Sequence, residues 1–220
     1  MSVFTKVDTD QLQTFLQQFD CGELVEHRGI AAGIENTNYF VTTTGGRFVL
    51  TLFENHGADE LPFFLDLMAY LAEHDIPTAH PVPTRDGNYL TELNDRPAAL
   101  VQRLTGGSLD HPDPAACAEI GRTLARFHRV SADFPEYRAP DRDLRWAEQV
   151  AVQLDERASD DERELLADEL AFQRGESRDG LPRGAIHADL FRDNALFEDG
   201  RLTGIIDLYY ASTDAFAYDL

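Results

Sequence analysis

The sequence has very little positive charge and almost no lysine. Of its 220 residues, 19 are Lys or Arg and 40 are Asp or Glu, which gives a formal net charge of −21 at pH 7, and Lys6 is the single lysine. A protein with this much negative charge repels phosphate backbones and anionic headgroups. We therefore expect no nucleic-acid partner and no membrane partner. Because the sole lysine lies at position 6, a nucleotide-binding loop of the Gly-Lys-Ser/Thr type is also excluded.

Cysteine and long apolar runs are scarce as well. Cys21 and Cys117 are the only two cysteines and lie far apart, which is typical of reduced thiols and not of a disulfide scaffold. No apolar run approaches the ~20 residues that span a bilayer, and the N-terminus lacks the apolar stretch of a secretory signal. We therefore predict a cytoplasmic protein. Nothing in the sequence indicates its oligomeric state.

The first hundred residues combine helical and β-like patterns. Apolar spacing predicts a helix over residues 9–19 and a second one that Asp59 would cap and that would end before Pro77. Alternating patterns separated by turn residues, including Gly45-Gly46, predict strands. These strands are expected at residues 23–30, 37–43, 47–53 and 97–104.

The chain becomes mainly helical after the break at Thr105-Gly106-Gly107-Ser108. A helix is expected from Asp113-Pro114 to about Arg129, and one or two charged helices over residues 141–174. Near the end, short strands are expected at residues 184–187, 195–197 and 202–208. The pattern indicates an α+β protein with a β-rich first lobe, residues 1–104, and a mainly helical second lobe, residues 105–220.

Residues suited to catalysis concentrate between two of these late strands. Asp189 follows His187 by two residues, Asn194 follows Asp189 by five, and Asp207 follows Asn194 by thirteen. In phosphoryl transfer, one carboxylate accepts the proton of the attacking hydroxyl, while an amide oxygen and a second carboxylate hold Mg²⁺. A short strand-turn-strand would bring residues 194 and 207 together. Ordinary loop hydrogen bonding could explain any one of these residues, but not the complete spacing.

Taken together, these motifs make the sequence resemble the aminoglycoside phosphotransferase/choline kinase superfamily and, within it, the homoserine kinases of that fold. The resemblance implies a bilobal protein-kinase-like fold, with an antiparallel sheet in the N-lobe and a mainly helical C-lobe. It also implies ATP-dependent phosphorylation of the L-homoserine hydroxyl in threonine biosynthesis. The matching segments are Phe48–Glu54, Leu61–Leu67, Leu181–Gly184, His187–Asn194 and Leu202–Ala211.

The resemblance also assigns roles to the late residues. Asp189 matches the catalytic base, Asn194 and Asp207 match the Mg²⁺ ligands, and His187 matches the histidine that positions the base without titrating in turnover. Arg192, in the same loop, is a candidate for stabilising charge on the transferred phosphate. The alternative is a surface arginine paired with its neighbour Asp193.

ATP is expected at the first lobe. Residues 28–39 lie where this fold places its phosphate-covering loop, although hairpin turns would explain the two glycines equally well. The strand at 97–104 corresponds to the segment whose backbone holds adenine, or else is an ordinary buried strand. The candidate nucleotide-binding residues are Arg28, Gly29, Gly33, Asn36, Gln102 and Leu104.

Three departures and alternatives remain. Thr51 stands where most members of the superfamily have a phosphate-binding lysine, so we expect Arg28 or magnesium to supply that charge.

The acceptor could instead be choline, an aminoglycoside, a sugar or methylthioribose, or the chain could be a non-catalytic protein of the kinase fold. Members of the family continue beyond the position of Leu220, so we expect a C-terminally truncated chain with an incomplete second lobe.

Overall fold

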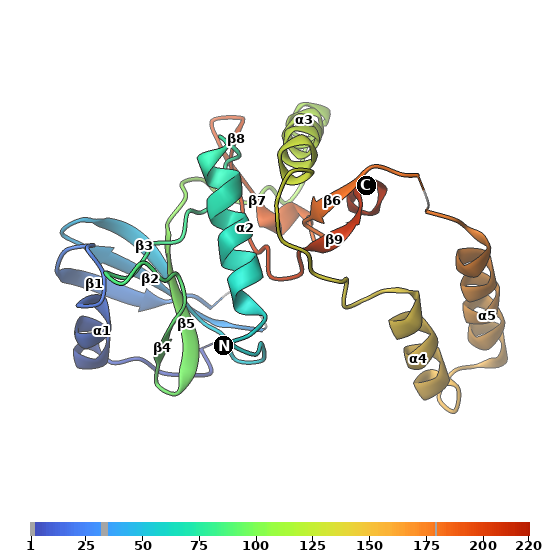
Figure 1. The fold of residues 1–220 in the computed structure, drawn as a ribbon, viewed down its shortest axis with the longest axis horizontal. Coiled ribbons are helices and arrows are strands. Elements are labelled where there is room, and N and C mark those ends of the chain that lie inside the picture. The colour runs from blue at the N-terminus through green and yellow to red at the C-terminus, as the bar shows by residue number, and fades with distance from the viewer. Residues whose placement is uncertain (1–2, 32–34, 179) are drawn as a thin grey trace.

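The first hundred residues form one antiparallel sheet. The computed structural model describes residues 3–31, 35–178 and 180–220. The sheet has five strands in the order β1-β2-β3-β5-β4, and lies at the left of Figure 1. Its strands are β1 (Leu24–Gly29), β2 (Thr37–Thr43), β3 (Gly46–Leu52), β4 (Thr91–Leu93) and β5 (Arg96–Gln102).

Helix α1 (Thr9–Leu16) covers one face of this sheet. Asp8 caps the helix by accepting a hydrogen bond from the backbone N–H of Gln11 at 2.9 Å, which satisfies one of the unpaired amides of the first turn. The helix buries Leu12, Phe15 and Leu16 in a core cluster with sheet residues of one face, among them Tyr39, Val41 and Leu100.

The opposite face of the sheet packs against helix α2 (Leu61–Glu73). Val101 of β5 and Phe64 of α2 belong to a second core cluster, and that cluster continues into the later part of the chain through Phe127 and Ile205. One apolar core therefore crosses residue 104. The division into a 1–104 and a 105–220 domain stays a prediction.

The later part of the chain contains three helices and two small antiparallel sheets. Asp113 caps α3 by accepting a hydrogen bond from the backbone N–H of Ala116 at 2.8 Å. One sheet pairs β6 with β9 and the other pairs β7 with β8. The bounds are α3 (Pro114–Ser131), α4 (Leu144–Leu154), α5 (Asp160–Gly175), β6 (Arg183–Ile186), β7 (Ala195–Glu198), β8 (Arg201–Ile205) and β9 (Ser212–Ala215), with 3-10 turns at Arg192–Asn194 and Phe216–Asp219.

Helices α4 and α5 stand away from the rest of the molecule (Figure 1). Neither helix has a buried residue, and an ion pair of 2.7 Å between Arg174 and Glu148 joins them. In the part of the chain that the structure describes, no helix has both the length and the apolar character needed to cross a membrane.

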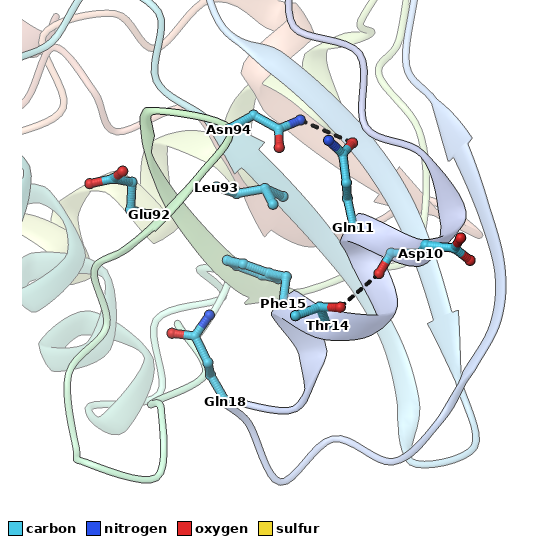
Figure 2. A pocket seen from close by; sticks show the side chains of 8 residues that line it. All are labelled: Asp10, Gln11, Thr14, Phe15, Gln18, Glu92, Leu93 and Asn94. Carbon is cyan, nitrogen blue, oxygen red and sulfur yellow. Dashed lines mark hydrogen bonds between the residues drawn. The ribbon is translucent and has the colours of Figure 1, made fainter.

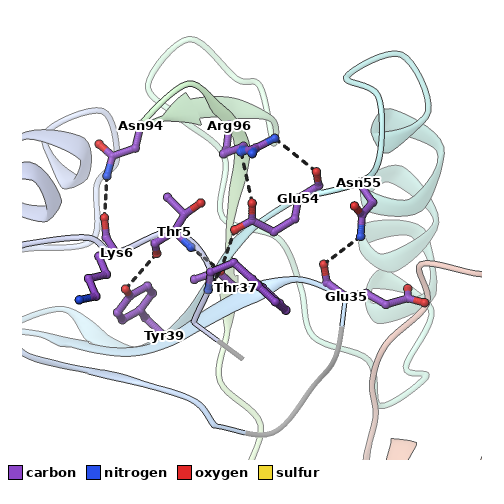
Figure 3. Close-up of polar contacts among 10 residues, drawn as sticks. Thr5, Lys6, Glu35, Thr37, Tyr39, Glu54, Asn55, Asn94 and Arg96 are labelled. Atoms are coloured by element: carbon purple, nitrogen blue, oxygen red, sulfur yellow. Dashed lines mark hydrogen bonds and ion pairs between the residues drawn. The ribbon is translucent and has the colours of Figure 1, made fainter. Parts of the chain in front are cut away.

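Polar contacts hold the N-terminal segment against the sheet (Figure 3). The hydroxyl of Thr37 accepts hydrogen bonds from the backbone N–H groups of Phe4 and Thr5, at 2.9 and 3.1 Å, and donates to Glu54 at 2.7 Å. Glu54 also pairs with Arg96 at 3.2 Å. These contacts fix the start of β2, which overlaps the end of the predicted phosphate-covering segment at residues 28–39.

A shallow pocket of about 440 Å³ lies between α1 and the β4–β5 hairpin (Figure 2). Phe15 forms its apolar floor, and most of its other lining side chains are acids or amides. The pocket belongs to the α1 side of the sheet, whereas the second core cluster joins the other side to the C-terminal strands. The lining residues are Asp10, Gln11, Thr14, Phe15, Gln18, Glu92, Leu93 and Asn94.

Most expected elements are present, with three corrections. Glu60, and not Asp59, occupies the N-cap of α2, and it makes no capping hydrogen bond through its side chain. The strand expected at 202–208 ends at Ile205, because Asp207 has a φ of +65° that a strand cannot accommodate. The first helix ends at Leu16, three residues earlier than its apolar pattern indicated.

Candidate active site

The candidate site is a loop between β6 and β7 together with the end of the β7–β8 hairpin. Residues 187–194 connect the two strands. Ala195 pairs with Ile205, and the N–H of Ile206 donates to the carbonyl of Asn194 at 3.0 Å. The hairpin therefore brings Asn194 and Asp207 to the same end, as the sequence predicted.

His187 is fully buried and connects the two sides of the site. Its Nε2 lies 3.0 Å from the carbonyl oxygen of Ile206, which can only accept, so Nε2 carries the proton. Its Nδ1 then accepts a hydrogen bond from the backbone N–H of Asp189 at 3.3 Å. Burial lowers the pKa of His187, which favours this neutral form. The histidine thus holds the backbone of Asp189 next to the segment that leads to Asp207.

Asp219 fixes the start of the same loop. Its carboxylate accepts hydrogen bonds from the backbone N–H groups of His187 and Ala188, at 3.0 and 2.7 Å, and pairs with His128 at 2.7 Å. Burial alone would raise the pKa of Asp219, but these hydrogen bonds outweigh it and hold the pKa below its usual value. Ala188 has a φ of +63°, a strained conformation for alanine, and Asp219 restrains it there.

Asp189 and Asn194 are joined by hydrogen bonds within the loop. The side-chain amide of Asn194 donates to the carbonyl oxygen of Asp189 at 2.8 Å and approaches its carboxylate at 3.4 Å. This orientation leaves the amide oxygen of Asn194 without a hydrogen bond in the described residues. Burial raises the pKa of Asp189, and the charges of Asp193 and Glu35 raise it further.

Asp207 is the second oxygen donor of the site. Surrounding protein desolvates its carboxylate although part of the side chain is exposed, and Asp189, Glu35 and Asp193 add negative charge; together they raise the pKa of Asp207 to about 6. No hydrogen bond to its carboxylate is present in the described residues. The raised pKa of Asp207 shows that the site concentrates negative charge, which a bound cation would neutralise.

The donor chemistry at this point fits Mg²⁺. Carboxylate and amide oxygens are the ligands that Mg²⁺ takes, and in nucleotide sites one or two protein oxygens suffice because phosphates and waters complete the shell. Asn194 and Asp207 offer two such oxygens from adjacent positions. Consistent with a site of few protein ligands, the described residues contain no group of three or more His, Cys, Asp and Glu side chains arranged to hold a metal.

Three residues that the sequence analysis did not select lie beside this loop. The hydroxyl of Tyr210 donates a hydrogen bond to the carboxylate of Glu35 and accepts one from Arg142 at 3.1 Å. The Arg142 guanidinium also lies 4.7 Å from the centre of the Tyr210 ring. These residues come from the segment before β2, the entry to α4 and the segment after β8, so no local sequence pattern joins them.

Arg192 is exposed at the other side of the loop. Its guanidinium donates a hydrogen bond to the carbonyl oxygen of Asp110 at 2.8 Å. Arg192 is therefore a surface arginine, as the alternative had it, but among the described residues its partner is Asp110 and not Asp193, and its role at the phosphate stays a prediction. To reach a phosphate, Arg192 would have to leave the carbonyl of Asp110.

The predicted nucleotide-binding residues are spread over the β1–β2 region. Arg28 is exposed, with its guanidinium 5.7 Å from the centre of the Phe40 ring. Gly29 lies at the end of β1, where an added Cβ would meet a side-chain methyl group of Val3 at 2.9 Å, so close packing is another reason for a glycine here. Asn36 is buried, and its amide oxygen has no hydrogen-bond partner. Gly33 lies outside the described residues.

Thr51 cannot contact a phosphate in the way that the lysine of related proteins does. Thr51 is buried, and its hydroxyl donates to the side chain of Asn38 at 2.7 Å. Two arginines lie near by on the same face of the sheet, because Arg103 stacks on Phe40 at 3.8 Å while Arg28 approaches the same ring. The positive charge near the predicted phosphate region therefore comes from arginine.

The β5 end that was expected to hold adenine has only one free amide. The N–H of Gln102 donates to the carbonyl of His80 at 2.9 Å, and that of Arg103 to Arg47 at 3.0 Å. Among the described residues, the N–H of Leu104 makes no such bond. Of the two predicted positions, Leu104 therefore keeps a backbone donor for a ligand, and the N–H of Gln102 is already used.

Known proteins resemble this chain along its whole length. The sequence model of the phosphotransferase enzyme family matches residues 26–220. Homoserine kinases of Methylobacillus flagellatus and Methylobacillus glycogenes are 50% and 47% identical over 220 residues, which is all of this chain and 69% of each relative. These relatives are longer than the chain, as the resemblance implied.

Solved structures share the fold at low sequence identity. An amicoumacin kinase, solved with AMP-PNP, Ca²⁺ and its antibiotic, superposes with a TM-score of 0.74 at 18% identity, covering 97% of this chain and 67% of its own. A spectinomycin phosphotransferase solved with ADP and spectinomycin gives 0.74 at 12% identity, covering 98% and 73%. The expected α+β, kinase-like fold is confirmed. The chain belongs to the phosphotransferase enzyme family and, within it, to the homoserine kinase family.

Proposed function

We propose that this protein is a cytoplasmic enzyme that transfers the γ-phosphate of ATP to the side-chain hydroxyl of L-homoserine, giving O-phospho-L-homoserine for threonine biosynthesis. The observation that supports the acceptor most directly is the similarity to homoserine kinases along the whole chain, at up to 50% identity. The loop that groups Asp189, Asn194 and Asp207 supplies the chemistry for phosphoryl transfer.

In this proposal Asp189 is the proton acceptor. It lies at a loop position held by His187 and Asp219, and its raised pKa suits a group that takes a proton from a hydroxyl. His187 and Asp219 are positioning residues, since they contact the backbone of the loop. Holding the acceptor hydroxyl at Asp189 makes the reaction effectively unimolecular, which accounts for much of the rate enhancement in such enzymes.

Asn194 and Asp207 would hold Mg²⁺ through their free oxygens. Bound Mg²⁺ neutralises charge on the phosphates of the nucleotide. Arg28 and Arg103, which flank Phe40, are proposed to replace the charge of the missing lysine. The N–H of Leu104 and the unpaired amide oxygen of Asn36 are the polar groups that we assign to the nucleotide on this side.

The acceptor is tested with a panel of hydroxyl compounds and ADP release as the signal. We expect kcat/KM for L-homoserine to exceed that for choline, an aminoglycoside, a sugar or methylthioribose by at least about 10²-fold, the scale of discrimination that a site with charged partners provides. Turnover of one of the other acceptors without turnover of homoserine would reject this substrate while keeping the kinase chemistry.

Replacing Asp207 by Asn tests the metal assignment. The substitution keeps an oxygen but removes the charge, so we expect the Mg²⁺ concentration for half-maximal activity to rise at least about 10-fold. Titration of activity with MgCl₂ measures this. Asp199→Asn, at the opposite end of the same hairpin where Asp199 is exposed, is the matched control and should leave the Mg²⁺ dependence unchanged. Equal Mg²⁺ curves for wild type and Asp207→Asn would refute the assignment.

A further inference from the structure

Arg142 is an exposed cation that aromatic rings hold in place. Its guanidinium rests on the ring of Tyr210 at 4.7 Å and lies 5.7 Å from the ring of Trp146. Within the described residues it makes no ion pair, although the chain carries more than two acidic side chains for each basic one. Stacking on aromatic rings orients a guanidinium while leaving its N–H edge free for a carboxylate or phosphate.

Glu35 is the complementary anion. Its backbone carbonyl is held by Asn55 at 3.4 Å, and Figure 3 shows its carboxylate pointing away from the polar network of the sheet. The carboxylate accepts a hydrogen bond from the Tyr210 hydroxyl and makes no ion pair in the described residues. A negative side chain within the predicted phosphate-covering segment would repel phosphate, so Glu35 suits a positively charged group of the acceptor.

Tyr210 places these two charges at a short, fixed separation. One hydroxyl accepts from Arg142 and donates to Glu35, so the cation and the anion lie on two sides of a single oxygen atom. An amino acid carries its carboxylate and its ammonium group on one carbon atom, which demands partners of opposite charge at similarly close range. Choline, sugars and methylthioribose have no such pair of charges.

The pair also lies close to the proton acceptor. The charges of both Arg142 and Glu35 act on the pKa of Asp189, which shows that both are close to it. Arg142 is not among the groups that shift the pKa of Asp207, on the metal side of the site. The charge of Glu35 also raises the pKa of Asp207, so Glu35 lies within range of both the proton acceptor and the metal ligands.

We propose that Arg142 binds the α-carboxylate of the acceptor amino acid and Glu35 its α-ammonium group, with Tyr210 joining and spacing the two. This inference rests on the proposed homoserine kinase function and specifies how that site selects its substrate. It assigns specificity to three residues that lie outside the catalytic loop and come from distant parts of the sequence.

The test removes each charged group of the substrate in turn and, separately, the protein side chain proposed to bind it. L-Homoserine is compared with 3-aminopropan-1-ol, which lacks the carboxylate, and with 4-hydroxybutanoate, which lacks the ammonium group. We expect Arg142→Ala to lower kcat/KM for homoserine about 10- to 100-fold, the value of a hydrogen bond to a charged group, and to change that for 3-aminopropan-1-ol less than about 3-fold. Glu35→Gln should show the reverse pattern, with the loss confined to substrates that carry the ammonium group.

Binding is measured separately through Trp146, the only tryptophan in the sequence. Because Arg142 lies against its ring, homoserine binding should change its fluorescence, and the titration gives Kd without requiring turnover. Arg142→Ala should raise this Kd while the Kd for ATP changes less than about 2-fold. Arg145→Ala removes an exposed arginine three positions further along, in the first turn of α4, and should leave both values unchanged.

Specific outcomes would overturn the inference. If Arg142→Ala affects homoserine and 3-aminopropan-1-ol equally, or weakens ATP more than homoserine, then Arg142 acts on phosphate. If Glu35→Gln raises the Mg²⁺ requirement and leaves the preference for the ammonium group intact, Glu35 belongs to the metal site. In wild type, homoserine turnover without any preference for its charged groups refutes only this inference. Absence of homoserine turnover and binding refutes the proposed function itself.

Discussion

Replacing Asp189 by Asn is expected to lower kcat by about 10²- to 10⁴-fold, the usual contribution of a positioned proton acceptor. The substitution is nearly isosteric and removes only the ability to take a proton. The backbone N–H of residue 189 still donates to His187, and its carbonyl still accepts from Asn194, so the loop should keep its shape. Steady-state kinetics with homoserine, together with a separate ATP titration, measures the effect.

Asp193 provides the matched control for Asp189. It lies in the same loop, is exposed, and contributes negative charge without a hydrogen bond to the loop backbone from its side chain in the described residues. Asp193→Asn should reduce kcat less than about 10-fold. The Kd for ATP should stay within about 3-fold of wild type in both variants. If Asp189→Asn retained kcat, or if Asp193→Asn lost as much, the proton-acceptor assignment would be wrong.

Replacing Asp219 by Ala is expected to impair stability and turnover together. The side chain of Asp219 is 1% exposed. Its loss leaves the N–H groups of His187 and Ala188, and the side chain of His128, without their hydrogen-bond partner. Each buried polar group left without its hydrogen-bond partner costs about 1–3 kcal/mol of unfolding free energy. Ala188 would lose the restraint on its positive φ, so Asp189 should become less well positioned, and kcat should fall more than the affinity for ATP. Urea unfolding and steady-state kinetics separate the two effects.

His128→Asn separates stability from positioning. This variant breaks the same ion pair but leaves the carboxylate of Asp219 bonded to the two loop amides. It should lower the free energy of unfolding while retaining most of kcat. Amide hydrogen exchange at residues 187 and 188 should accelerate in Asp219→Ala and stay slow in His128→Asn. Equal losses of kcat in the two variants would contradict a positioning role for Asp219.

The pKa of Asp219 predicts how pH changes the difference in stability between wild type and the variant Asp219→Asn. Because the pKa is lower in the folded state than in the unfolded chain, the contribution of the charged carboxylate to stability is fully present above the unfolded value of about 3.9. It is lost as the pH falls through the folded pKa. The difference in unfolding free energy between wild type and Asp219→Asn should therefore narrow below about pH 4.

The sequence was most informative where the relevant residues are neighbours. His187, Asp189 and Asn194 share one loop, and the hairpin that carries Asp207 has strong local signals: apolar strands around an Asp199-Gly200 turn. Their grouping was therefore predictable from spacing alone. The exception is the end of β8, where Leu208 and Tyr209 continue the apolar pattern because they enter the core, although Asp207 has already turned the backbone.

Residues that act across long sequence separations gave no such signal. Asp219 reaches the loop from 31 and 32 positions away, and Tyr210 contacts Glu35 across 175 positions. An isolated acid or tyrosine has many ordinary roles, and only the packing of separate elements shows which one applies. The same limit explains Gln102, whose backbone N–H was predicted to be free but is bound to His80, a residue whose position depends on the loop after α2.

In the proposed reaction, phosphate passes directly from ATP to the hydroxyl of homoserine at a site built around Asp189. Phosphorus NMR of a reaction with ATP, MgCl₂ and L-homoserine tests it most directly. We expect a phosphate monoester on the homoserine side-chain oxygen, formed in equal amount to ADP and at least about 10²-fold more slowly with Asp189→Asn. ADP accompanied only by free phosphate, or the monoester formed equally by Asp189→Asn, would contradict it.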